Sequence, residues 1–113
     1  MTQAGTQDVA RSALPSPSPV EPPAPLSGLL SAALHDPVLA GVVDAAGWPA
    51  NRITGPVGLR PFVAAALAAP GTVGGAGVPV CLVTATGREA DVAAAAIADL
   101  IGAEHVEVFP SWE

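Results

Sequence analysis

The sequence predicts an α/β protein: an incomplete, helicase-like or P-loop-NTPase-like parallel sheet of three strands flanked by helices, preceded by a helical pair and a disordered tail. Three observations lead to this class. Short apolar runs alternate with helical patterns in the second half of the chain, a glycine-containing turn joins the first run to a helix, and 113 residues suffice for one domain. Because strand–helix–strand crossovers are right-handed, a parallel three-strand sheet is the natural assembly.

Two regions differ in composition. Residues 1–26 are predicted to be a disordered, Pro-rich tail, since the run "PSPSPVEPPAP" at Pro15–Pro25 removes backbone donors and favours polyproline II geometry. Residues 27–113 are predicted to form a partial α/β domain that is truncated at its C-terminus. Most of its apolar residues are Ala and Val, so we expect a small core and, for the 113-residue chain alone, marginal folding.

A helical pair opens the domain. The stretch "LSGLLSAAL", residues 26–34, predicts a helix with Ser27 as its N-cap. In "HDPVLAGVVDAAG", residues 35–47, Asp36 is the expected N-cap of a second helix that ends at Gly47. His35 lies between the two helices and is expected to cap the first one or to meet solvent, because no Cys or second His stands at metal-ligand spacing.

Alternating strands and helices follow. We expect a strand over residues 51–54, a helix from Pro56 or Leu59 to Ala69, and a flexible loop over residues 70–79. The near-continuous apolar run "PVCLVT", residues 79–84, predicts a parallel strand buried on both faces, with Cys81 as a buried, inert thiol.

The last helix and strand have clear end signals. Thr86 and Glu89 predict a capping box, and Gly102 predicts the end of the helix. "HVEVFP", residues 105–110, predicts the third strand, and His105 is expected to form a surface ion pair with Glu104.

The stretch "ITGPVGLRPF", residues 53–62, has the outline of a phosphate-binding loop. A working loop needs a lysine and a hydroxyl that holds Mg²⁺, and this chain contains no lysine. Pro56 and Pro61 also lack the N–H groups that would donate to an anion. We therefore predict a degenerate phosphate loop, marked by Gly55, Gly58 and Arg60, that binds no cofactor.

No other catalytic or metal site is expected. The turn "TATGREAD", residues 84–91, could attract an anion, but its acidic residues compete for the same donors, so a structural cap is favoured. The sequence shows no Ser/His/Asp set, Cys/His pair, carboxylate dyad or zinc spacing. We expect no enzyme activity from this fragment.

Charge and targeting signals limit the partners. A net charge of −6, with four arginines and no lysine, disfavours direct nucleic-acid binding. A single cysteine suggests a reducing compartment, and neither a secretory leader nor a membrane span is visible, so we expect a soluble, cytoplasmic protein.

Residues 80–113, "VCLVTATGREADVAAAAIADLIGAEHVEVFPSWE", resemble the N-terminal region of the actinobacterial transcription-repair coupling factor. The stretches "LSGLL…DPVLAGVVDAAG" and "ITGPVGLRPFVAAALA" fit the same layout, so the resemblance covers about residues 26–113. It implies an excinuclease-B-like module whose phosphate loop is degenerate. For the full-length family it implies an ATP- and Mg-dependent DNA translocase that displaces stalled RNA polymerase and recruits the excinuclease A protein.

Two alternatives stay open from the residues. One is a small nucleotide-binding α/β protein that uses "ITGPVGLRP". The other is a complete α/β interaction module that binds a protein partner through its acidic helix or its Pro-rich tail.

Overall fold

A computed structural model describes residues 24–110. Nearly all of the predicted tail, residues 1–23, lies outside the described residues, as do residues 111–113. Four α-helices make up most of the described chain: α2 (Ser27–Ala33), α3 (Pro37–Asp44), α4 (Arg60–Ala68) and α5 (Gly87–Ile101). One-turn 3₁₀ helices extend or precede them: Ala45–Gly47, Val57–Leu59, Gly71–Val73 and Ala103–His105.

The helical pair forms largely as predicted. The Asp36 carboxylate accepts hydrogen bonds from the amides of Val38 (2.8 Å) and Leu39 (3.4 Å), which caps α3. His35 lies 2.9 Å from the Ser31 carbonyl through its Nδ1, which confirms its role at the end of α2. The prediction for Ser27 was wrong: α2 begins one residue earlier, with Leu26 at the N-cap and no side-chain cap.

The last helix also has its predicted ends. The Thr86 hydroxyl accepts a 3.1 Å hydrogen bond from the Glu89 amide and lies 2.9 Å from the Glu89 carboxylate. Gly102 follows the helix with a φ of 101°, a left-handed value that favours glycine. Beyond it, His105 and Glu104 form the expected surface ion pair, with 3.4 Å between Nε2 and Oε1.

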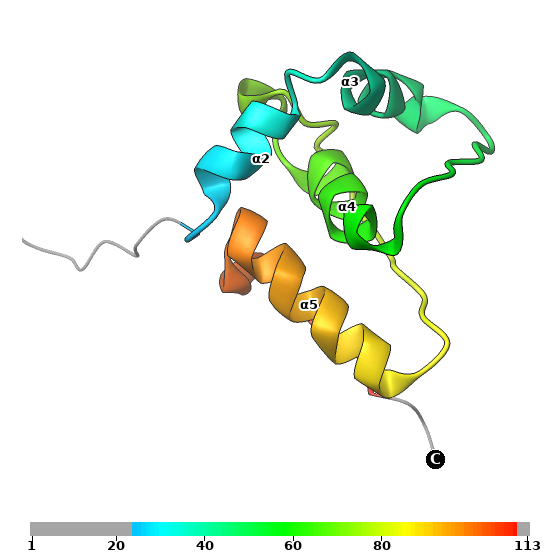
Figure 1. Ribbon diagram of the computed structural model, residues 1–113, viewed down its shortest axis with the longest axis vertical. Helices are drawn as coiled ribbons and strands as arrows, with labels where there is room; N and C mark the ends of the chain where they lie inside the picture. The colour runs from blue at the N-terminus through cyan, green and yellow to red at the C-terminus, as the bar shows by residue number, and fades with distance from the viewer. Residues whose placement is uncertain (1–23, 111–113) are drawn as a thin grey trace, which may run out of the picture.

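The core lies where α5 crosses α4 and α2 (Figure 1). Its buried residues are mostly alanine and leucine: Leu30, Leu34, Ala65, Ala66, Ala69 and Leu100. Alanine buries little apolar area, so each of these alanines contributes little to the free energy of folding. The small core agrees with the composition, whereas the expected marginal stability stays a prediction.

The predicted parallel sheet of three strands is absent from the described residues, which contain no β-strand at all. The three candidate segments are irregular or extended, and no backbone hydrogen bond joins any two of them. A pattern of apolar residues indicates an extended conformation, but it does not indicate which strand lies beside which. The expected burial of "PVCLVT" is wrong for the same reason: Val83 is 84% exposed, and Cys81 is exposed rather than buried.

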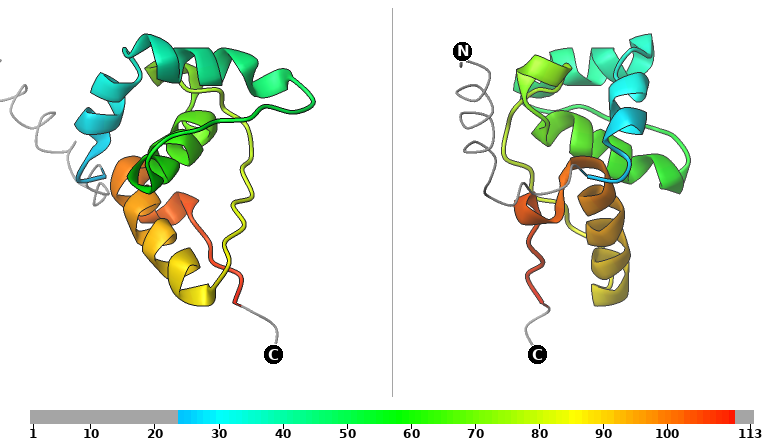
Figure 2. Two further views of the ribbon diagram at one scale, coloured as in Figure 1. Left: turned by 45° about the vertical axis from the view of Figure 1, so that its right-hand side comes forward. Right: turned by 90° about the vertical axis from the view of Figure 1, so that its left-hand side faces the viewer.

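Two of the three predicted strand segments, residues 78–86 and 106–110, nevertheless lie next to each other on one side of α5. Residues 78–86 run toward the start of α5, and residues 106–110 follow its end, so both run opposite to α5 and in the same direction (Figure 2). The loop before the first segment is anchored to α4, because the amides of Ala76, Gly77 and Val78 donate to the carbonyls of Ala66, Ala69 and Leu67.

Candidate functional site

The sequence-predicted phosphate loop leads into α4. Gly55, Gly58 and Arg60 are all exposed, and a 3₁₀ turn over Val57–Leu59 stands between Gly55 and the helix. Within this turn the Leu59 amide donates to the Pro56 carbonyl (3.0 Å), and the Arg60 amide donates to the Val57 carbonyl. The turn thus uses for itself two amides that an anion would need, and the prolines at positions 56 and 61 supply none.

The loop borders a wide cavity of about 920 Å³, here called the loop cavity. Apolar side chains from α3, α4 and the extended segment line most of it, among them Leu39, Val63 and Leu82. Asp36 and Arg60 are the charged residues in its lining, and Asp36 already caps α3. An apolar wall with a single arginine suits an apolar partner better than a triphosphate.

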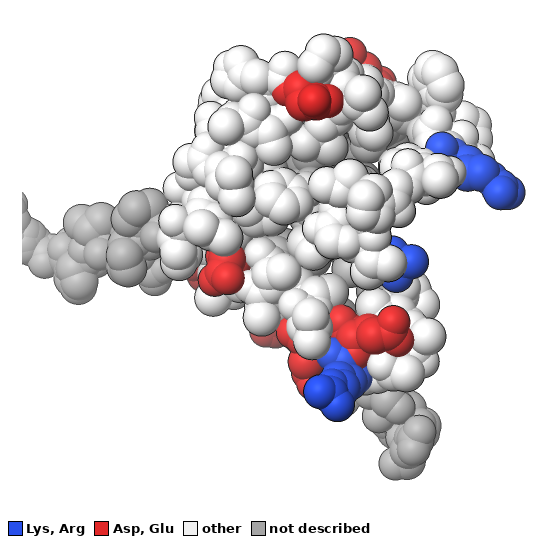
Figure 3. Space-filling view, viewed as in Figure 1, with Lys and Arg blue, Asp and Glu red and all other residues white. Residues whose placement is uncertain are grey.

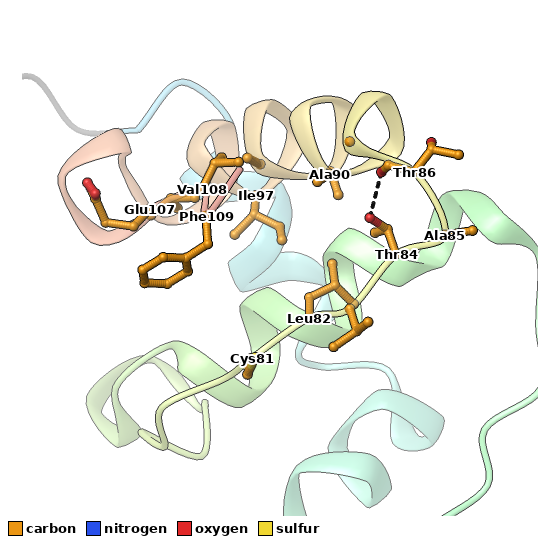
Figure 4. Close-up of a pocket in the computed structure, with 15 residues that line it drawn as sticks. Cys81, Leu82, Thr84, Ala85, Thr86, Ala90, Ile97, Glu107, Val108 and Phe109 are labelled. Carbon is orange, nitrogen blue, oxygen red and sulfur yellow. Dashed lines mark hydrogen bonds between the residues drawn. The ribbon is translucent and has the colours of Figure 1, made fainter. Parts of the chain in front are cut away.

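A second cavity, of about 740 Å³, lies between the two extended segments and is here called the C-terminal cavity. Residues 81–87 form one wall, residues 106–109 form the other, and α5 contributes small side chains from one face, including Ala90 and Ala94 (Figure 4). Sequence reasoning missed this cavity, because it assigned both walls to a continuous sheet. The spacing of Ala90, Ala94 and Ile97 on one helical face was the available signal.

The second predicted anion site, at residues 84–91, is occupied by the helix cap. The Thr86 hydroxyl and the Glu89 carboxylate lie together there, so a negative charge already stands at this helix start.

Charged side chains are sparse on the surface seen in Figure 3, where uncharged residues cover most of the area and the basic groups stand apart from one another. The three described arginines, Arg52, Arg60 and Arg88, are all exposed. In residues 24–110 no group of three His, Cys, Asp or Glu side chains lies close enough together to hold a metal ion. Apolar side chains thus make up most of the lining of both cavities, and neither lining contains more than two charged residues.

No helix within the described residues is by itself both long enough and apolar enough to cross a membrane. The pair Ser27–Ala33 and Pro37–Gly47 passes that test only when the two are taken together, across an 89° bend.

Comparison with known proteins identifies one kind of relative. Over 100 residues, or 87% of its length, the chain is 37% identical to the transcription-repair-coupling factors of Mycobacterium bovis and of Mycobacterium tuberculosis. The match covers only 8% of each of these relatives. No protein-family model matches the chain, and no solved structure gives a significant match. The resemblance drawn from the sequence is thus confirmed as similarity to a fragment of a transcription-repair-coupling factor.

Proposed function

We propose that this chain is part of a transcription-repair-coupling factor and serves there as a non-catalytic scaffold. The observation that carries the proposal is the 37% identity to two such factors over 100 residues. The longer protein would act in the cytoplasm on DNA and stalled RNA polymerase, consume ATP with Mg²⁺, and recruit the excinuclease A protein. Its motor would lie outside these 113 residues, which match 8% of each relative.

The scaffold role rests on the chemistry of the loop at residues 53–62. A phosphoryl-transfer site places a lysine and a hydroxyl-bound magnesium ion against the phosphates. The chain has no lysine, and the loop's own 3₁₀ turn uses two of the backbone amides. Arg60 is the one cation in the lining of the loop cavity, and its rigid guanidinium fork substitutes poorly for a compact ammonium group in a tight loop.

Direct contact with DNA is also disfavoured for this part of the protein. The net charge is −6, and the exposed arginines form no continuous patch on the face shown in Figure 3. Affinity for the phosphate backbone depends on accumulated positive charge. The scaffold would therefore act through contacts with other polypeptide segments.

A chimera tests the scaffold role. The matched segment of the M. tuberculosis coupling factor is replaced by the corresponding residues of this chain, and the displacement of stalled RNA polymerase is measured. We expect displacement at a rate near that of the unmodified factor. A second chimera with Ala65→Arg, which places a charge in the buried core, is the inactive control. A folded first chimera that displaces no polymerase would refute the proposal.

Nucleotide titration tests the rival function. We expect ATP with Mg²⁺ to give no calorimetric signal with the 113-residue chain and to leave its melting temperature unchanged. Saturable binding that is lost in Arg60→Ala would instead support a small nucleotide-binding protein, and it would contradict the degenerate loop.

A further inference from the structure

The loop cavity has the size and the lining of a small-molecule site. Its volume is about 920 Å³, and small-molecule sites occupy roughly 300–1,000 Å³. Large apolar side chains line it from several elements, among them Leu39 on α3, Phe62 on α4 and Leu82 on the extended segment. Sites of this kind combine an apolar wall with a few polar groups that set the orientation of the ligand.

Much of this apolar lining is exposed to solvent. Val38 is 77% exposed, and Leu29, Ile53 and Leu59 are about half exposed. A ligand that covers these side chains gains the free energy of apolar burial. The occupant that suits the cavity is therefore largely apolar.

The two charged residues of the lining differ in their engagement. Asp36 accepts the amide hydrogen bonds that cap α3, and the start of that helix offsets its negative charge. Arg60 has no carboxylate partner within residues 24–110, where the described ion pair joins His105 to Glu104. The cavity thus offers one unpaired positive charge, which an occupant with one negative charge complements.

Two further polar groups of the lining belong to the loop that leads to Arg60. Within residues 24–110, neither the Thr54 hydroxyl nor the Gly55 amide has a hydrogen-bond partner. Both groups are donors, as is the guanidinium group. A polar end that consists of oxygen acceptors is therefore favoured.

We propose that the loop cavity binds an amphiphilic monocarboxylate of the fatty-acid type, with its carboxylate on Arg60 and its hydrocarbon chain along the apolar lining. A guanidinium group binds a carboxylate through two parallel hydrogen bonds. A triphosphate would bring several negative charges to one arginine, and an extended peptide would bring backbone amides that apolar walls leave without partners. This proposal goes beyond the scaffold role and does not depend on it.

Calorimetric titration of the 113-residue chain with dodecanoate tests the site. An osmolyte is present to stabilise the chain, circular dichroism checks its helix content, and the acid stays below its micelle concentration. We expect one saturable site, and we expect decanoate to bind about 15-fold more weakly, because two fewer methylene groups are buried. Several acid molecules bound per chain, or equal affinities for the two acids, would overturn the proposal.

A matched pair of arginine variants tests the position of the carboxylate. We expect Arg60→Gln to weaken dodecanoate binding about 10-fold, because a charge-assisted hydrogen bond is lost, and to leave the binding of uncharged dodecanol unchanged. Arg52→Gln makes the same change at an exposed arginine outside the lining, and both ligands bind to it as to the original chain. An equal loss of dodecanoate affinity in the two variants would refute the role of Arg60.

A second matched pair tests the position of the hydrocarbon chain. Val38→Asp places a negative charge on an exposed part of the lining and is expected to weaken dodecanoate binding at least 10-fold, that is, by about as much as a lost charge-assisted contact. Val92→Asp makes the same change on α5, where the side chain is 64% exposed and outside both cavity linings, and it is the control. Leu29→Asp replaces Val38→Asp if the helix content of the latter falls. Unchanged binding in a folded Val38→Asp variant would refute the site.

The outcomes also separate this proposal from the proposed function. A chain that binds dodecanoate through Arg60, with a chimera that displaces no polymerase, supports the site and refutes the scaffold role. An active chimera whose 113-residue chain binds no dodecanoate refutes the site alone.

Discussion

The backbone amide of Leu26 donates a 2.7 Å hydrogen bond to the backbone carbonyl of Asp99. This bond joins the start of α2 to the last turns of α5, although the two residues are far apart in the sequence. It holds the first helix against the helix that forms the floor of the C-terminal cavity. Because α2 lines part of the loop cavity and α5 lines the C-terminal cavity, this hydrogen bond connects one wall of each cavity.

Leu26→Pro tests the hydrogen bond between the Leu26 amide and the Asp99 carbonyl. The substitution removes the donor, and proline also prefers a φ near −65°, whereas Leu26 has a φ of −112°. We expect a loss of about 1–3 kcal/mol in the free energy of unfolding, measured by urea denaturation with an osmolyte present to stabilise the chain. Leu26→Ala keeps the amide and is the control. Identical urea midpoints for both variants would show that the hydrogen bond is unimportant.

Ala65→Leu tests the packing of α4 against α5. Ala65 has no exposed surface, so the added atoms have no space and must push the helices apart. We expect destabilisation of about 1–3 kcal/mol in the same measurement. Ala95→Leu adds the same atoms on the exposed face of α5 and is expected to have little effect. Destabilisation of equal size in both variants would contradict the described core.

Thr86→Ala tests the start of α5. The variant loses the hydroxyl that accepts from the Glu89 amide, and an N-cap of this kind contributes about 0.5–2 kcal/mol. Circular dichroism during thermal unfolding should show a lower melting temperature for Thr86→Ala. Thr86→Ser retains the acceptor and is expected to melt close to the original chain. If both variants melt alike, the cap is not what sets the stability of this helix.

Gly75→Ala tests the anchored loop after α4. A Cβ at this position would collide with the carbonyl group and side chain of Ala69, which are backbone and short-chain atoms that cannot move aside cheaply. We expect a large loss of stability, together with faster exchange of the neighbouring amides of Gly77 and Val78. Gly71→Ala lies in the same loop with open space around its Cβ, and it is the matched control. Tolerance of Gly75→Ala would mean that the loop can shift away from α4.

The sequence predicted the helices well because their signals are local. Asp36 and Thr86 accept hydrogen bonds from amides two or three residues away, and Gly102 needs only its own backbone conformation. Each of these features is contained in one short stretch of sequence, so spacing alone identifies it. The misplaced cap at Ser27 is an error of a single residue.

The sheet could not be predicted in the same way, because strand pairing is a relationship between distant residues. The run "PVCLVT" is not helical, as its pattern indicates, but its neighbours were inferred by assuming that the strands of this chain pair with one another. The burial expected for Cys81 failed along with that assumption. At the loop near Gly55 and Gly58, the missing lysine was visible in the sequence, whereas the adjacent apolar cavity required the fold.

Cys81, exposed on a wall of the C-terminal cavity, is the one thiol in this polypeptide. A maleimide fluorophore would therefore attach at a single known point without mutagenesis, and the absence of lysine leaves few competing amines for a second dye directed to the N-terminus. The emission of such a probe would report in real time whenever another segment of chain enters or leaves its surroundings.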